Sequence, residues 1–196
     1  MAYVITCRRP KIAVDLDNTL AASMKAQLRV HSENEGRSLD MSDIKSIDIN
    51  SEFERLGLNL DITDMVYRRI WKENHVIPPL DSYTVETMGR ISSIFSVTIL
   101  TATIASEDEI KEWCQRNKIF YDHIVKLPGP AKFEFAKESR IYKFIDDSLE
   151  MTVVNDSGKD LILIRQPWNS NVVANQKNER LRIANDWKEV GSLLRF

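Results

Sequence analysis

The feature that most constrains the fold of this chain is a series of short apolar runs separated by segments of helical character. Four runs rich in β-branched residues have the length of strands: residues 11–16, 97–100, 143–145 and 161–164. A weaker fifth run covers residues 123–126. Helix starts lie between them, the clearest at Ser106, where Ser106 and Glu109 form a capping box. Strands that alternate with helices predict a parallel sheet covered on both faces.

The spacing of the expected strands is uneven and indicates an insertion. About eighty residues separate the first strand from the second, whereas the later strands follow one another closely. Within this interval, residues 20–30 and 62–74 look helical, and residues 32–59 contain no convincing strand. We therefore expect an α/β fold with a three-layer, Rossmann-like parallel-sheet core formed by residues 1–19 and 79–196. A small, mostly helical cap, residues 20–78, is expected after the first strand.

Charge and composition limit the partners of the chain. Lysine plus arginine (27) against aspartate plus glutamate (29) gives a net charge of −2, which provides no bulk basic field for a long nucleic acid. No apolar run has the length of a signal peptide or membrane span, so we expect a cytoplasmic protein without a membrane partner. Cys7 and Cys114 lack the spacing of a disulfide framework or zinc site. A homo-oligomer is compatible with the sequence.

Polar side chains follow three of the expected strands, where ligands bind in an open α/β sheet. Asp15 and Asp17 end the first, Thr101 ends the second, and Asp146 and Asp147 end the strand that begins at residue 143. Crowded carboxylates repel one another unless a cation neutralises them, and ligands that are all oxygen favour Mg²⁺. Because bound Mg²⁺ commonly also contacts substrate phosphate, this pattern predicts phosphoryl chemistry. A turn at Asp17 could instead offer a backbone carbonyl to the metal.

In type and order along the chain, these residues resemble the motifs of the haloacid-dehalogenase (HAD) superfamily of phosphohydrolases. The resemblance implies that Asp15 is the nucleophile and that Asp17 is the general acid/base. It also implies an aspartyl-phosphate intermediate that water then hydrolyses. The remaining implied roles are substrate binding by Thr101, Ala102 and Lys132, magnesium binding by Asp15, Asp17 and Asp146, and support by Asp147.

The superfamily also has a lysine before the last motif strand, and three lysines are candidates for it. Lys132 follows Pro128-Gly129-Pro130 at the expected start of a helix over residues 131–139. There its charge opposes the helix dipole but adds to the free backbone N–H groups in attracting an anion. Lys137 and Lys143 lie in positions typical of solvated charges. We therefore assign the role to Lys132.

Beyond these motifs, the sequence most resembles the 5'(3')-deoxyribonucleotidases, the cytosolic type C 5'-nucleotidases. The similarity lies in the run 100–103 followed by Trp113, in the cap around Gly36, and in the run 166–169. It implies a nucleoside 5'-monophosphate as the substrate. In the cap, Tyr67 and Trp71 could stack on a base while Arg68 and Arg69 bind phosphate. Aromatic residues on an amphipathic helix more often belong to the core, however.

Alternatives from other classes remain open at this point. The substrate could be another small phosphorylated metabolite or a nucleic-acid end. A phosphoacceptor receiver domain groups similar residues, but its Asp pair follows the first strand and its lysine comes last, which is not the order here. A catalytically inactive binding module is disfavoured because all the expected side chains are present.

Overall fold

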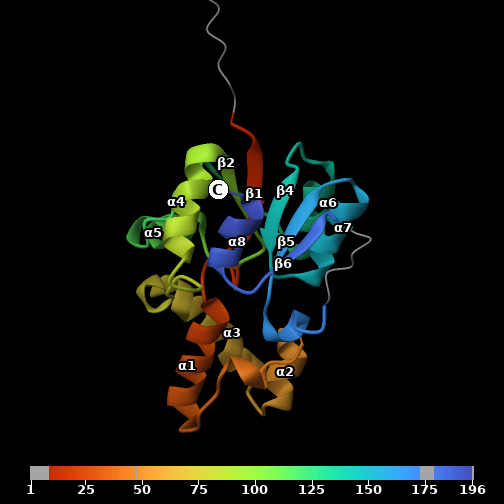
Figure 1. Ribbon diagram of the computed structural model, residues 1–196. Coiled ribbons are helices and arrows are strands. Elements are labelled where there is room, and N and C mark those ends of the chain that lie inside the picture. The colour runs from red at the N-terminus through yellow and green to blue at the C-terminus, as the bar shows by residue number, and fades with distance from the viewer. Residues whose placement is uncertain (1–8, 47, 173–178, 196) are drawn as a thin grey trace, which may run out of the picture.

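A computed structural model (Figure 1) describes residues 9–46, 48–172 and 179–195 of the chain. Six parallel strands form one sheet in the order β3-β2-β1-β4-β5-β6. The strands are β1 (Lys11–Val14), β2 (Ser96–Thr101), β3 (His123–Lys126), β4 (Lys143–Asp146), β5 (Asp160–Ile164) and β6 (Leu181–Ala184). The predicted α/β class and all five predicted strands are confirmed. The edge strand β6 was not predicted.

Helices cover both faces of the sheet because apolar side chains point to alternate sides of each strand. On β1, Ile12 and Val14 belong to the apolar cluster that contains the inner side chains of α4, α5 and α8, whereas Ala13 packs with the cluster beneath α6 and α7. The helices are α1 (Ser23–Glu35), α2 (Ile49–Arg55), α3 (Leu60–Lys72), α4 (Thr84–Ile94), α5 (Glu107–Arg116), α6 (Gly129–Glu138), α7 (Val153–Asp156) and α8 (Trp187–Leu194).

The segment inserted between β1 and α4 is helical and lies beyond the carboxyl ends of the strands (Figure 1). Its α1 and α2 contribute to a small apolar cluster that includes Leu28 and Phe53 and is completed by Trp168 from the segment after β5. The inner stripe of α3 joins the main core through Val66 and Ile70. Ile62, one helical turn before Val66, is exposed. That residues 20–78 act as a cap over the core stays a prediction.

The loop from β1 to α1 is tighter than the sequence suggested. A helix from residue 20 was expected, but α1 begins at Ser23 because residues 18–21 form a turn in which the Asn18 N–H donates to the Ala21 carbonyl at 2.7 Å. Asn18 has a left-handed φ of 56°, a conformation that asparagine tolerates better than most residues. Its Oδ1 accepts the N–H of Met24 at 2.9 Å and so satisfies a free donor at the start of α1.

The strand order excludes the receiver alternative. In the receiver order 2-1-3-4-5 the first strand lies between the second and third, whereas here β1 lies between β2 and β4. Among the helices that the structure describes, none has the length and apolar character needed to cross a membrane. Cys114 is buried, and burial raises the pKa of its thiol to about 12, whereas Cys7 lies outside the described residues.

A buried lysine holds the carboxyl end of α6. The Nζ atom of Lys159 donates to the carbonyls of Ala136 and Ser139, and it lies 5.7 Å from the ring centroid of Phe144. A cation at this end of a helix satisfies free carbonyls and complements the helix dipole. Burial lowers the pKa of Lys159, which reflects the cost of desolvating its charge.

Lys159→Met is expected to lower the free energy of unfolding by about 2 kcal/mol, because it leaves these buried carbonyls without a donor. Chemical denaturation measures this change. The matched variant Lys143→Met breaks a partly exposed pair with Asp160 and should cost less than about 1 kcal/mol. Equal losses in the two variants would contradict the stabilising role of Lys159.

Candidate active site

The candidate site lies where the strand order reverses, at the carboxyl ends of β1 and β4. The chain runs from β1 outward to β2 and β3 and then returns to the other side of β1 with β4. Open α/β sheets bind their ligands at such a switch point. Asp15 follows β1 directly, its N–H donates to the Ile145 carbonyl at 2.9 Å, and Asp146 is the last residue of β4. The topology therefore brings Asp15 and Asp146 side by side.

Lys132 bridges these two carboxylates. From the second turn of α6, its Nζ atom lies 2.7 Å from Asp15 Oδ1 and 2.9 Å from Asp146 Oδ2, and all three side chains are buried. Lys137 instead pairs with Glu134 at 3.0 Å, with both side chains largely exposed. Lys143 pairs with Asp160, as described above. Of the three candidate lysines, only Lys132 reaches the aspartates.

The protonation behaviour of this cluster reflects burial and crowding of like charges. Burial raises the pKa of Asp15 to about 7, with a further rise from Asp146, while Lys132 acts in the opposite direction. Burial, with Asp15 and Asp146, also raises the pKa of Asp147 well above its usual range. For Lys132, burial lowers the pKa, but the carboxylates of Asp146 and Asp15 outweigh it and raise the pKa above its usual value. One ammonium group thus faces three buried carboxyl groups.

The three carboxyl groups could hold a divalent cation. Asp15, Asp146 and Asp147 each offer an oxygen, and these oxygens lie within 4.8 Å of one another. A donor set made only of oxygen suits Mg²⁺, and its excess negative charge over Lys132 would be neutralised by a cation. The residues therefore fit a magnesium ion. The Asp17 carboxylate is not part of this cluster. The group of Asp17 that could bind the cation is therefore its backbone carbonyl.

The Asp17 side chain contacts the helical insertion instead. Tyr67 of α3 donates its hydroxyl to Asp17 Oδ2 at 2.7 Å, and Thr103 Oγ1 lies 3.1 Å from the same hydroxyl. Because the single Tyr67 proton goes to Asp17, the Thr103 hydroxyl is the donor in the second bond. The other carboxylate oxygen, Asp17 Oδ1, is buried and has no partner among the described residues. It is therefore available to a ligand.

A cavity of about 300 Å³ brings most of the predicted site together. Its lining consists of Asp15, Asp17, Asn18, Tyr67, Thr101, Ala102, Thr103, Lys132 and Asp147. The hydroxyl oxygen of Thr101 accepts the N–H of Thr103 at 3.2 Å, so its proton is free to be donated to a ligand. Of the residues to which the family resemblance assigned catalytic, substrate-binding, metal-binding or supporting roles, Asp146 alone does not line the cavity, and it contacts the site through Lys132.

Three polar residues that support the site were not assigned from the sequence, or were assigned only loosely. Thr19 is buried and donates to Asp147 Oδ1 at 3.2 Å. Asn169 donates from its amide to the Asp147 carbonyl at 2.9 Å, and Gln166 donates to the Asn18 carbonyl at 2.7 Å. The segment after β5 thus makes hydrogen bonds to the loops that follow β1 and β4. In the sequence, the run 166–169 contributed to the family resemblance but did not predict these contacts.

Of the two cap aromatics, Tyr67 lines the cavity and Trp71 does not. Trp71 is fully buried and packs edge-on against Trp113 at a centroid distance of 6.4 Å. The interpretation of Trp71 as a base-stacking residue is therefore wrong, because its side chain belongs to the apolar core. Arg68 and Arg69 form exposed ion pairs with Asp64 and Glu73 on their own helix and do not line the cavity.

Comparisons with known proteins find a likeness in structure. Neither a family model nor a curated protein sequence matches this chain. A haloacid dehalogenase-like hydrolase of Streptococcus pneumoniae matches with a TM-score of 0.64 at 18% identity, over 95% of this chain and 99% of the other. The HAD hydrolase YfnB of Bacillus subtilis, solved with bound magnesium, matches with a TM-score of 0.59 at 15% identity, over 96% and 100%.

Phosphatases and dehalogenases both occur among the matching structures. A predicted phosphoglycolate phosphatase of Haemophilus somnus matches with a TM-score of 0.59 at 14% identity, over 97% of this chain and 100% of the other. Two further matching structures are L-2-haloacid dehalogenases. At these identities the likeness concerns the fold. The chain therefore has the fold of the HAD-superfamily hydrolases.

Proposed function

We propose that this protein is a magnesium-dependent phosphomonoester hydrolase that works through an aspartyl-phosphate at Asp15. The observation that supports it most is the buried cluster in which Lys132 bridges Asp15 and Asp146. Asp17, which lines the same cavity, adds an Oδ1 atom that has no partner within the described part of the chain. This arrangement sets a nucleophile, a proton donor and a positive charge around one small cavity. These are the groups that phosphoryl transfer needs.

In the proposed reaction, Asp15 attacks phosphorus while Asp17 protonates the departing alcohol from Oδ1. The bond to Lys132 fixes the orientation of the attacking carboxylate, and the Tyr67 hydroxyl fixes that of Asp17. The Thr101 hydroxyl and Lys132 bind the phosphoryl oxygens, on which negative charge is concentrated. Asp17, now a carboxylate, then accepts a proton from the water that hydrolyses the aspartyl-phosphate.

A magnesium ion, held by Asp15, Asp146 and the backbone carbonyl of Asp17 with Asp147 in support, would neutralise the carboxylates and polarise the phosphoryl group. The oxygens of Asp15, Asp146 and Asp147 lie close enough together for this role. Thr19 and Asn169 hold Asp147 through its side chain and its carbonyl, which keeps the acidic cluster in place despite its mutual repulsion.

The first-choice substrate is a nucleoside 5'-monophosphate, with another small phosphomonoester as the alternative. Both fit a phosphoryl site of about 300 Å³, to whose lining α3 of the insertion contributes Tyr67. Phosphate release should be measured over nucleotides, sugar phosphates, p-nitrophenyl phosphate and phosphorylated DNA ends, with Mg²⁺ and with a chelator. We expect release from small esters only with Mg²⁺. Halide release from 2-haloacids without any phosphatase activity would overturn the proposal in favour of a dehalogenase.

The Tyr67 hydroxyl is expected to matter most when the leaving group needs a proton. Tyr67→Phe should lower kcat for an alkyl phosphate by about tenfold, because Asp17 loses the bond that orients it. For p-nitrophenyl phosphate, whose leaving group is stable as an anion, the loss should be about twofold or less. The control Tyr83→Phe removes an exposed hydroxyl away from the site. Equal losses with both esters would show that Tyr67 acts only through packing.

A further inference from the structure

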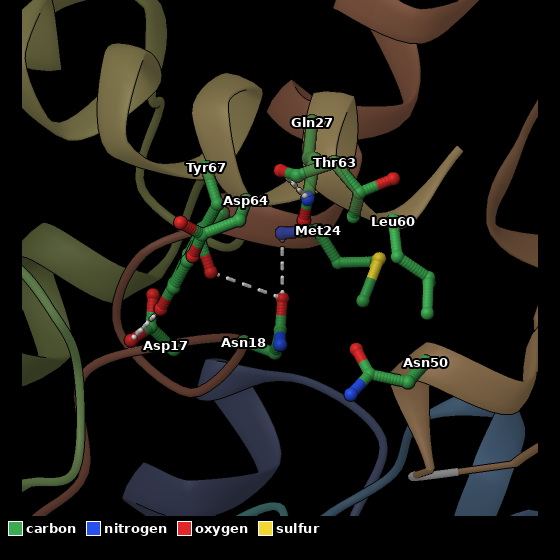
Figure 2. Close-up of a pocket in the computed structure, with 10 residues that line it drawn as sticks. Asp17, Asn18, Met24, Gln27, Asn50, Leu60, Thr63, Asp64 and Tyr67 are labelled. Carbon is green, nitrogen blue, oxygen red and sulfur yellow. Dashed lines mark hydrogen bonds between the residues drawn. The ribbon is translucent and has the colours of Figure 1, made fainter. Parts of the chain in front are cut away.

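A second cavity adjoins the catalytic cavity and is built mainly by the helical insertion. It has a volume of about 280 Å³ and lies between the β1–α1 loop and helices α1, α2 and α3 (Figure 2). Asp17, Asn18 and Tyr67 line both cavities, so the two cavities meet at these three residues. In Figure 2, Asp17 and Tyr67 lie at one end of it, and Asn50 and Leu60 lie at the other. The part of a substrate beyond the bond that Asp17 would protonate therefore belongs here.

The described lining of this second cavity contains acidic side chains but no lysine, arginine or histidine. The acidic residues are Asp17, which enters the proposed reaction protonated, and Asp64. Arg68 pairs with Asp64 at 2.8 Å and offsets part of its charge, although both side chains are more than half exposed. Arg68 itself lines a different hollow, beside Trp71. A second anionic group on a substrate would thus meet Asp64 and find no basic side chain among the described residues that line the cavity.

The uncharged part of the lining suits hydroxyl and amino groups. Gln27 is buried, and its amide nitrogen donates to the Thr63 carbonyl at 3.1 Å, which leaves its carbonyl oxygen as an acceptor. The side-chain oxygen of Asn18 accepts the N–H of Met24, which leaves its amide nitrogen as a donor. The Thr63 hydroxyl is buried without a partner among the described residues. Met24 and Leu60 add apolar surface for a carbon skeleton.

We propose that the second cavity receives the leaving group, and that this group is uncharged or cationic and carries hydroxyl or amino groups. Asp64 sets this preference by disfavouring substrates with a second anion, such as a carboxylate or another phosphate. The inference rests on the proposed phosphatase function and narrows it. It favours phosphate esters of nucleosides, polyols or amino alcohols over phosphorylated acids and bisphosphates.

Three butyl phosphates that end in an ammonium, a hydroxyl or a carboxylate group test the proposal, because they share a carbon chain and differ in the charge and type of the terminal group. With Mg²⁺, the wild-type kcat/KM for the carboxylate ester should be about fivefold below that of the other two, given the Coulomb energy of like charges near the solvent. Asp64→Asn should narrow this gap several-fold, and Asp64→Lys should favour the carboxylate ester. The control Asp61→Asn removes a charge from the same helix outside the cavity and should leave the ratios unchanged.

Two results would contradict the proposal in different ways. Hydrolysis of p-nitrophenyl phosphate without discrimination among the three butyl esters, or with ratios unaffected by Asp64→Lys, would overturn the leaving-group assignment and leave the phosphatase function standing. Failure of every ester, p-nitrophenyl phosphate included, to release phosphate with Mg²⁺ would overturn the proposed function, and the leaving-group assignment with it.

Discussion

Asp15→Asn is expected to reduce phosphate release at saturating Mg²⁺ by at least ~10³-fold, because a neutral amide cannot attack phosphorus as a carboxylate does. The fold should survive, since the amide oxygen can still accept the bond that Lys132 now donates to Asp15 Oδ1 at 2.7 Å. Steady-state kinetics with p-nitrophenyl phosphate measures the loss, and circular dichroism checks the fold.

The matched control for this variant is Asp156→Asn. Asp156 is exposed at the end of α7, and its change should leave kcat/KM within about twofold of the wild type. Wild-type activity in Asp15→Asn would refute the assignment of the nucleophile. Activity lost in both variants to the same degree would point to a general effect of removing acidic charge.

Lys132→Ala is expected to lower kcat/KM by ~10²–10³-fold, because it removes the positive charge that orients Asp15 and meets the phosphoryl oxygens. It should also destabilise the metal-free protein, since three buried carboxyl groups then face one another without their ammonium partner. Kinetics at saturating Mg²⁺, with circular dichroism under the same conditions, separates the catalytic effect from unfolding.

Two other lysines serve as controls. Lys137 lies on the same helix as Lys132, and Lys143 lies in β4. Replacing either lysine by alanine removes only a solvent-accessible ion pair. Both variants should retain kcat/KM within about threefold of the wild type. A folded Lys143→Ala protein with crippled activity, together with an active Lys132→Ala protein, would show that the lysine has been misassigned.

The sheet and the ends of its strands were predictable because their signals are local. Each predicted strand is a short run of β-branched residues, and the acids that end β1 and β4 follow those runs directly. Parallel pairing then places them at one edge of the sheet without further information. The edge strand β6 was not predicted because Arg182 interrupts its apolar residues.

The contacts that orient the candidate site were not predictable because they join residues distant in the sequence. Tyr67 lies 50 positions from Asp17, and Thr19 lies 128 positions from Asp147. Neither residue has a local pattern that distinguishes it from an ordinary amphipathic or turn residue. Trp71 shows the same limit: its position on an amphipathic helix favoured the core over a ligand surface, and packing against Trp113 decided for the core.

The charge of the second cavity also depends on tertiary structure. Asp64 and Arg68 are a helix pair at i, i+4 in the sequence, and this pattern usually indicates only a solvated face. In the folded chain Asp64 lines the second cavity and Arg68 lines another hollow. The preference for an uncharged or cationic leaving group follows from that difference, which no spacing in the sequence contains.

In the proposed mechanism, Asp15 carries the phosphoryl group during turnover. The most direct measurement is rapid acid quenching of the enzyme with Mg²⁺ and an alkyl phosphate, followed by peptide mass mapping. We expect one added phosphoryl group, on the peptide that contains Asp15, and its absence when Mg²⁺ is chelated. Sustained phosphate release with no modified peptide, or with the phosphoryl group on another residue such as Asp147, would contradict it.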